Sequence, residues 1–201
     1  MIERVLERLG SCDSLGPIIV ATSSHPTDDP LADFLRSIGV RCHRGSLKHV
    51  AHRAVSAAVE LGAERFFRVN GDSPFAAIEL FSSAVSLANQ TDADLVSNIY
   101  PRVLPPGASV ELVRTNALAS CLSEMSPDEA EHVTAYMYRH PCNFKIEHLP
   151  CPGYTFTEKI RLVVDDAEDM NRAERVLLRM NHPHWEYGVQ DVINLMSSTA
   201  S

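Results

Sequence analysis

The sequence predicts an α/β protein with a doubly wound, mostly parallel sheet and helices on both faces of that sheet. Short apolar, β-branched runs alternate with helical segments along the first half of the chain. Strands and helices that alternate in this way form parallel βαβ units, whose crossover helices cover both faces. The sequence contains no internal repeat and no flexible linker, so we expect a single domain over residues 1–201.

The first half of the chain predicts a regular alternation. Gly39 and Gly62 are expected to end two of the helices, because glycine readily takes the left-handed conformation there. Asp28 and Asp29 are expected to cap the start of one of them. The run PIIVAT (Pro17 to Thr22) is apolar and β-branched, which predicts a buried strand. The expected helices span about 1–10, 31–38, 47–61 and 76–87, and the expected strands span 17–22, 40–43 and 65–70.

The second half of the chain is less regular. A proline-rich segment over 100–107 separates two short apolar runs. The expected strands span 94–98, 109–113, 143–149 and 159–164, and the expected helices span 116–124, 127–138, 168–180 and 189–196. This order keeps the strand–helix alternation that the fold class requires.

Composition excludes several classes of protein. A net charge of −8 argues against binding to nucleic acid through its phosphate backbone, which needs clustered lysine and arginine. No apolar run approaches the roughly 18 to 20 residues that cross a bilayer. Five cysteines without a Cys-x-x-Cys pair predict free thiols in a reducing compartment. We therefore expect a cytoplasmic protein with neither a nucleic-acid nor a membrane partner.

Two acidic residues follow expected strands directly. Asp72 comes after the strand over 65–70, and Asp165 comes after the strand over 159–164. Ligands of doubly wound sheets bind beyond the carboxyl ends of the strands, and Mg²⁺ bound to nucleotide phosphates needs only one or two protein oxygens. Aspartates are also common caps of turns and helices, so the spacing leaves both readings open. Gly71 either lets the backbone approach a ligand or simply makes the turn.

Longer stretches of the sequence carry a resemblance. They are IIVATSSHPTDDPLADFLRSIGVRCHRGS, RFFRVNGDSPF, DADLVSNIYPR, PPGASVELV, EAEHVTAYMY and IRLVVDDAEDM, in this order. Together they resemble the spore coat polysaccharide biosynthesis (F type) and acylneuraminate cytidylyltransferase family over about residues 18–180. Several ordered matches are far more specific than any single motif.

The resemblance implies a function. Such enzymes transfer CMP from CTP to a nonulosonic or related sugar and release pyrophosphate, with Mg²⁺ as cofactor, for surface polysaccharide synthesis. The partners it implies are CTP and a sugar, and the oligomeric state stays open, with a homodimer among the alternatives.

The resemblance also assigns roles to single residues. It implies that Asp72 and Asp165 bind the metal. His132 is implied either as a catalytic base or as a residue that positions the sugar. The residues that it places near the substrates are Arg44, Arg68, Asn70, Gly71, Glu111 and Glu131.

The sequence departs from the family at its start. The family's opening strand and its phosphate-binding loop, which ends in a Pro-Gly-Lys type signature, have no counterpart here. Ser73 also replaces the usual cysteine, and Ser109 replaces an aspartate. We therefore expect the first central strand to be missing, with a gap or an altered pairing between PIIVAT and RFFRVN. Because an open gap leaves backbone groups unpaired, we expect the two strands to close on each other, a segment of a second chain to fill the place, or the isolated protein to be poorly stable. We also expect negligible turnover of CTP by the chain as given, about 100-fold or more below normal.

Three readings stay open. The chain is an active cytidylyltransferase without its opening segment, a non-catalytic homologue that binds a sugar nucleotide or a protein, or an unrelated α/β domain.

Overall fold

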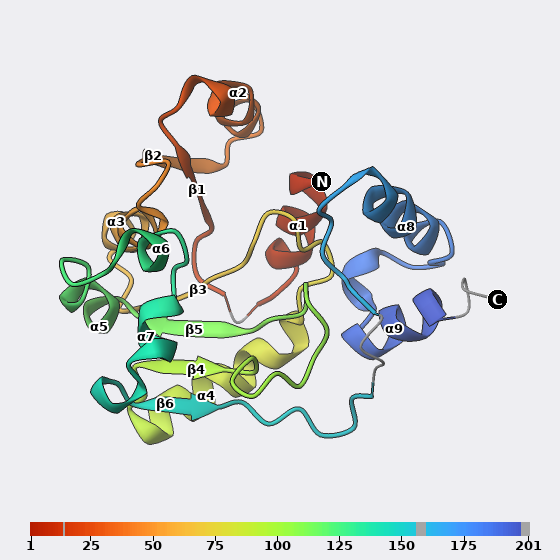
Figure 1. Ribbon diagram of the computed structural model, residues 1–201. Coiled ribbons are helices and arrows are strands. Elements are labelled where there is room, and N and C mark those ends of the chain that lie inside the picture. Colours follow the sequence, from red (N-terminus) through yellow and green to blue (C-terminus); the bar gives the residue numbers. More distant parts are fainter. Residues whose placement is uncertain (14, 156–159, 198–201) are drawn as a thin grey trace.

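The computed structural model describes residues 1–13, 15–155 and 160–197 (Figure 1). The first half holds α1 (Ile2–Gly10), β1 (Ile19–Ser23), α2 (Asp29–Ser37), β2 (Arg41–Gly45), α3 (Val50–Glu60), β3 (Arg65–Phe67) and α4 (Phe81–Thr91). The second half holds β4 (Leu95–Ser97), β5 (Glu111–Arg114), α5 (Thr115–Ser120), α6 (Pro127–Ala130), α7 (Ala135–Arg139), β6 (Ile146–His148), α8 (Ala167–Leu177) and α9 (Val189–Ser197). The predicted α/β class is confirmed.

The described strands form two separate sheets. β1 and β2 pair in parallel, and β3, β5, β4 and β6 form a second sheet in that order. β4 and β6 are parallel, whereas β5 is antiparallel to both of its neighbours. No helix lies between β4 and β5 in the chain, so the chain turns back directly and the strands run in opposite directions.

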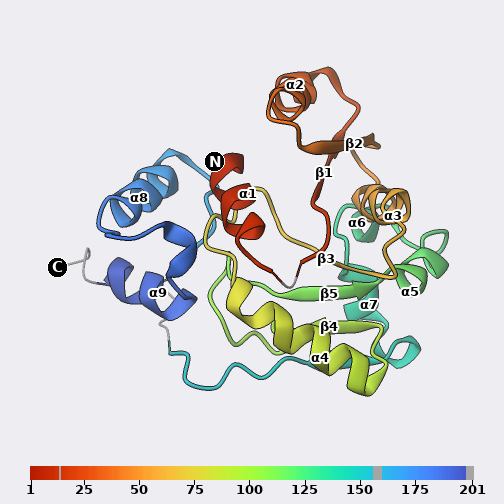
Figure 2. The ribbon, with the colours of Figure 1, turned by 180° about the vertical axis from the view of Figure 1, so that it is seen from behind.

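Side chains alternate across the four-stranded sheet and build a core on each face. Val96 and Leu112 pack into the cluster that contains Phe81 of α4. Leu95 and Val113 pack into the other cluster, with residues of α5 and α7. Figures 1 and 2 show α4 on one face of this sheet and α7 on the other, so helices do cover both faces.

A buried arginine ties the two ends of the chain together. Arg8 of α1 is only 1% exposed, and burial lowers the pKa of its guanidinium. Its Nε donates to the Ala76 carbonyl at 2.6 Å, Nη1 donates to the His184 carbonyl at 2.7 Å, and Nη2 donates to the Tyr187 carbonyl at 2.9 Å. α1 is thereby fixed to the segment before α4 and to the segment before α9.

The strand pairing leaves a gap next to β1. Within the described residues, β1 pairs only with β2 and β3 pairs only with β5, so no ladder joins β1 to β3. The gap between PIIVAT and RFFRVN is therefore present, and of the expected outcomes the direct closure of the two strands on each other does not occur. Ile19, Val20 and Ala21 are only half-buried, and the prediction of a buried strand is wrong here because one edge of β1 has no neighbour.

Two further predictions on secondary structure are wrong. The single helix expected over 127–138 is split into α6 and α7, because the chain turns between them and directs the Thr134 hydroxyl to Glu111. Residues 160–164 of the strand expected over 159–164 form no strand, and Lys159 lies outside the described residues. Leu162 N donates to the Pro106 carbonyl and Val164 N donates to the Asp72 carbonyl, so this segment bonds to two loops and not to one strand.

Asp28 was expected to cap α2, and the structure gives its carboxylate another role. Its side chain makes no capping bond to α2. It accepts hydrogen bonds from the Thr22 hydroxyl at 2.7 Å, the Ser23 hydroxyl at 2.7 Å and the Ser23 backbone N–H at 2.9 Å. These bonds, that of Thr22 first, hold the pKa of Asp28 well below its usual range. The carboxylate therefore fixes the end of β1 to the start of α2.

This arrangement predicts the response of stability to acid. Because the pKa of Asp28 is lower in the folded than in the unfolded chain, its contribution is present above pH 4 and lost as the pH falls below about 3.9, the unfolded value. We expect the free energy of unfolding of Asp28→Asn to fall less steeply between pH 5 and pH 2 than that of the wild type. Urea titrations at several pH values measure this. Asp33→Asn, at an exposed ion pair on α2, is the control, and equal slopes for Asp28→Asn and wild type would contradict the prediction.

None of the helices among the described residues is long and apolar enough to span a membrane.

Candidate active site

A polar cavity of about 300 Å³ lies beyond the end of β3. We call it the polar cavity. Three segments contribute to it, namely residues 68–76 after β3, residues 99–109 between β4 and β5, and residues 161–165 before α8. Its charged and hydrogen-bonding side chains are Arg68, Asn70, Asp72, Ser73, Arg102, Ser109, Arg161 and Asp165.

A glycine lets two of these segments approach each other closely. Gly107 has a φ of +94°, and a Cβ on it would clash with the carbonyl carbon of Leu162 and lie 2.5 Å from the nitrogen of Val163. The Leu162 N–H donates to the Pro106 carbonyl at 2.7 Å, and the Val164 N–H donates to the Asp72 carbonyl at 2.9 Å. These contacts place the segment before α8 against the segment after β3.

The two aspartates expected at strand ends line this one cavity. Asp72 accepts a hydrogen bond from the Ser73 hydroxyl at 2.9 Å. Asp165 forms an ion pair with Arg161, and both side chains are more than half exposed. Asp166 caps α8 by accepting from the Asp169 N–H at 2.8 Å. The helix-capping role therefore belongs to Asp166, and the carboxylate of Asp165 is left to the cavity.

The donor set fits one kind of metal site. The described residues contain no group of three or more His, Cys, Asp or Glu side chains that could hold a metal ion. Mg²⁺ bound to nucleotide phosphates takes only one or two carboxylates and fills its other positions with water and phosphate oxygens. Asp72 and Asp165 fit that requirement, and their role as metal ligands stays a prediction.

Three guanidinium groups give the polar cavity its positive charge. Arg68 pairs with Glu111 at 2.9 Å, Arg102 donates to the Ser109 hydroxyl at 3.2 Å, and Arg161 pairs with Asp165. Guanidinium groups bind phosphate oxygens through two parallel hydrogen bonds, so the cavity suits a phosphorylated ligand. Arg102 and Arg161 were not predicted from the sequence. The signal was their position in the matched stretches DADLVSNIYPR and IRLVVDDAEDM.

Glu111 supports the cavity from beneath and does not line it. Its side chain is fully buried. It accepts hydrogen bonds from Arg68 at 2.9 Å, the Thr134 hydroxyl at 2.6 Å and the Tyr138 hydroxyl at 2.8 Å. Burial and the nearby Glu111 carboxylate raise the pKa of Tyr138, which keeps the phenol neutral and able to donate. Glu111 therefore orients Arg68 and fixes α7 to β5.

The structure brings together some of the other predicted substrate residues. Asn70 lines the polar cavity beside Arg68 and Asp72. Gly71 lines the neighbouring gap between β1 and β3. The strand predicted over 65–70 ends earlier, at Phe67, so Asn70 and Gly71 lie in the loop after β3.

The remaining predicted residues lie outside the polar cavity. Arg44 of β2 donates to the His25 carbonyl at 3.2 Å and pairs with Asp29 at 2.8 Å, so it holds the loop after β1. Glu131 and His132 are exposed and line neither the polar cavity nor the gap. The structure therefore gives these three residues no contact with the cavity, and their roles in binding and catalysis stay predictions.

Comparisons with known proteins agree with this fold. The family model for Cytidylyltransferase matches residues 1–189. The uncharacterized protein MJ1063 of Methanocaldococcus jannaschii is 33% identical over 170 residues, which cover 84% of this chain and 69% of that protein. The spore coat polysaccharide biosynthesis protein SpsF of Bacillus subtilis is 29% identical over 154 residues, which cover 76% of this chain and 63% of SpsF. The matched region thus spans about two thirds of these relatives.

Solved structures show the same fold. A cytidylyltransferase from Leptospira borgpetersenii superposes with a TM-score of 0.88 at 23% identity, over 99% of this chain and 83% of that one. A CMP:2-keto-3-deoxy-manno-octonic acid synthetase complexed with CTP superposes with a TM-score of 0.62 at 11% identity, over 89% of this chain and 87% of that one. The family model covers most of the chain, and this chain belongs to the cytidylyltransferase family, whose enzymes are nucleotidyltransferases.

Proposed function

We propose that the chain transfers CMP from CTP to a hydroxyl group of a nonulosonic or related sugar at the polar cavity, and that pyrophosphate leaves. The observation that carries the proposal is the meeting of two carboxylates and three guanidinium groups in one cavity beyond β3. A sugar acid as acceptor is supported by the name of the synthetase complexed with CTP, and a role in surface polysaccharide synthesis by that of SpsF.

The cavity residues have distinct tasks in this reaction. Asp72 and Asp165 would hold Mg²⁺ through their carboxylate oxygens. When bound, the ion supplies charge neutralisation at the transferred phosphoryl group and at the leaving pyrophosphate. Arg161, which pairs with one carboxylate oxygen of Asp165, would bind a phosphate oxygen of the same ligand. Arg68, already oriented by Glu111, would bind the triphosphate from the other side.

Positioning accounts for much of the expected rate. In-line placement of the sugar hydroxyl against the α-phosphate removes much of the entropic cost of a bimolecular step. His132 as the acceptor of the hydroxyl proton stays a prediction, because its exposed side chain lies outside the polar cavity. All five cysteines are free thiols, which supports a reducing, cytoplasmic setting for the reaction.

A second candidate is a homologue that binds the nucleotide without transfer. One observation favours it. Arg68, Val69 and Asn70 line both the polar cavity and the gap between β1 and β3, so the cavity is open on the side of β1. Such an opening leaves fewer groups to hold a triphosphate in line for transfer.

Binding of CTP is the sharper first test, because it does not depend on which sugar accepts the CMP. Titration calorimetry with CTP and MgCl₂ compares the wild type with Asp72→Asn and Asp165→Asn. We expect each variant to bind Mg²⁺-CTP at least about 10-fold more weakly, since even the loss of a residue behind a metal ligand costs that much. Asp166→Asn is the matched control, because Asp166 neighbours Asp165 but caps α8. Unchanged affinity in both cavity variants would contradict the proposal.

Pyrophosphate release then separates the two candidates. The assay contains the wild type, CTP, MgCl₂ and a panel of nonulosonic acids. Slow release that requires a sugar and is lost in Asp72→Asn supports transfer. Tight binding of Mg²⁺-CTP with no release at any enzyme concentration supports the non-catalytic candidate.

A further inference from the structure

Two hydroxyl side chains of α7 meet at the carboxylate that holds Arg68. Thr134 directly precedes α7 and Tyr138 lies four residues later, so both side chains project from the same face of the helix. That face packs on β5, where Glu111 is the first residue. No described residue of α7 lines the polar cavity. The helix can therefore act on a ligand there only through other side chains.

Both hydroxyls donate to one oxygen of Glu111, and Arg68 donates to the other. The Thr134 hydroxyl lies 2.6 Å and the Tyr138 hydroxyl 2.8 Å from Oε1, whereas Nη1 of Arg68 lies 2.9 Å from Oε2. Rotation about the last side-chain bond of a glutamate is otherwise soft. Two donors on Oε1 fix the plane of the carboxylate, and the position of Oε2 follows from that plane. The hydroxyls of α7 thereby decide where the guanidinium is held.

Tyr138 also reaches the segment between β4 and β5 that borders the polar cavity. Its hydroxyl lies 2.6 Å from Oγ of Ser97, and the N–H of Ile99, a residue that lines the cavity, donates to the same Oγ at 3.1 Å. Because a carboxylate only accepts, the single phenolic proton goes to Glu111 and the Ser97 hydroxyl donates to the phenol oxygen. The ring of Tyr138 contacts that of Tyr100, with 5.5 Å between their centroids. Tyr138 thus connects two walls of the cavity.

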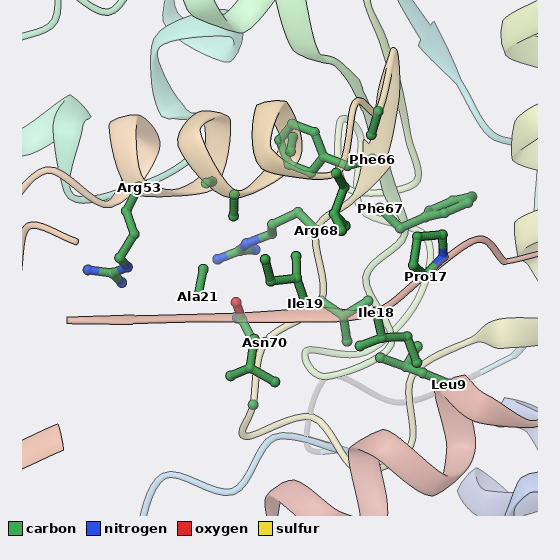
Figure 3. Close-up of a pocket in the computed structure, with 18 of the residues that line it drawn as sticks. Leu9, Pro17, Ile18, Ile19, Ala21, Arg53, Phe66, Phe67, Arg68 and Asn70 are labelled. Atoms are coloured by element: carbon green, nitrogen blue, oxygen red, sulfur yellow. The ribbon is translucent and has the colours of Figure 1, made fainter. Parts of the chain in front are cut away.

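Arg68 needs such support because its side chain is long. A guanidinium that is free to move loses rotamer freedom when it binds a phosphate, whereas one that is already held loses less. Figure 3 shows Arg68 extending from the segment after β3 toward the side of Ala21. Its bond to Glu111 uses Nη1, which leaves the N–H groups of Nε and Nη2 for phosphate oxygens.

We propose that Thr134 and Tyr138 are positioning residues for the phosphates of the ligand, because they hold Glu111 and, through it, Arg68. This role rests on the proposed function, since Arg68 acts only where a phosphorylated ligand binds. Removing either hydroxyl frees the carboxylate to rotate. The guanidinium then faces the phosphates in a smaller fraction of its conformations, and the affinity for the nucleotide falls.

Titration calorimetry of the whole protein with Mg²⁺-CTP tests this role. Tyr138→Phe removes the hydroxyl and keeps the ring, and we expect binding to weaken about 3- to 30-fold, the range for a residue that acts on a ligand without touching it. Tyr136→Phe is the matched control, because it removes a hydroxyl of the same helix that is bonded to Glu124 at 2.6 Å. It should bind Mg²⁺-CTP like the wild type.

A double-mutant cycle distinguishes positioning from a general structural role. Arg68→Gln removes the charge and keeps an N–H donor for Glu111, and in this background Tyr138→Phe should change the affinity by about 2-fold or less. Arg161→Gln removes a guanidinium that pairs with Asp165 and not with Glu111. In that background Tyr138→Phe should keep its full effect. A general loosening of the fold would weaken binding equally in every background.

Thr134→Val is the second variant, for the case that Tyr138→Phe does not fold. It removes the other hydroxyl at Oε1 and no capping bond, since the Thr134 side chain does not cap α7. It should weaken binding with the same dependence on Arg68. Equal losses in the Arg68→Gln and Arg161→Gln backgrounds, or wild-type affinity in both hydroxyl variants, would overturn the role of α7 and leave the proposed function intact. A wild type that does not bind Mg²⁺-CTP would overturn both.

Discussion

Replacing Glu111 with alanine should lower the free energy of unfolding by about 3 to 5 kcal/mol, the usual cost of breaking a buried charged pair. Glu111 is fully buried and accepts hydrogen bonds from Arg68, Thr134 and Tyr138. Without the carboxylate, the two hydroxyl donors lose an acceptor and Arg68 loses its partner. Urea denaturation followed by circular dichroism measures the loss.

Two variants serve as controls for this prediction. Glu111→Gln keeps the shape of the side chain and one oxygen, so we expect a smaller loss than for Glu111→Ala. Glu124→Gln removes the charge from an exposed glutamate that also accepts from a tyrosine hydroxyl, that of Tyr136, and should change stability by less than about 1 kcal/mol. A stability of Glu111→Ala within 1 kcal/mol of wild type would show that the network does not hold α7 on β5.

Replacing Gly107 with alanine should lower the free energy of unfolding by about as much as Glu111→Ala does. The φ of +94° disfavours any side chain, at about 1 to 3 kcal/mol, and the clash of the new Cβ with the Leu162 carbonyl adds about 1 to 3 kcal/mol more. Since Leu162 cannot stay in place, the segment that carries Asp165 should also move. We therefore expect both a lower free energy of unfolding and weaker binding of Mg²⁺-CTP.

The variant Gly62→Ala distinguishes the backbone strain of a positive φ from the steric clash of the added Cβ. Gly62 has a φ of +65°, but a Cβ there would meet no heavy atom within 4 Å. Only the backbone strain remains, about 1 to 2 kcal/mol, and the polar cavity should be unaffected. Urea denaturation and calorimetry on both variants make the comparison. If Gly107→Ala and Gly62→Ala lowered the free energy of unfolding equally, the segment around Leu162 would accommodate the added Cβ without further cost.

Apart from the strand over 159–164, the sequence predicted the approximate positions of the strands and the presence of the two aspartates in one cavity, because both leave local signals. The strand PIIVAT has an apolar, β-branched pattern, and an aspartate directly after a strand lies at the carboxyl edge whatever the rest of the sheet does. The order of the family motifs predicted the open position between β1 and β3, since each motif corresponds to one element of the family's sheet.

Other features have no local signal. The direction of β5 depends on the lack of a helix after β4, and the irregular backbone of 160–164 depends on loops distant in sequence. Asp28 precedes a helix and looks like a cap, yet its carboxylate bonds to Thr22 and Ser23 instead. Tertiary contacts decide such cases, because several local partners are equally accessible to a short acidic side chain.

The buried guanidinium of Arg8 has a consequence for the timing of folding during synthesis. Its three acceptor carbonyls belong to Ala76, His184 and Tyr187, and the last of these follows it by 179 residues. On the ribosome, α1 cannot complete its docking until the segment before α9 has been translated. At about 5 to 20 residues per second, its apolar face waits for roughly 10 to 35 seconds. During that interval α1 is available to chaperones, although it is synthesised long before the segment on which its docking depends.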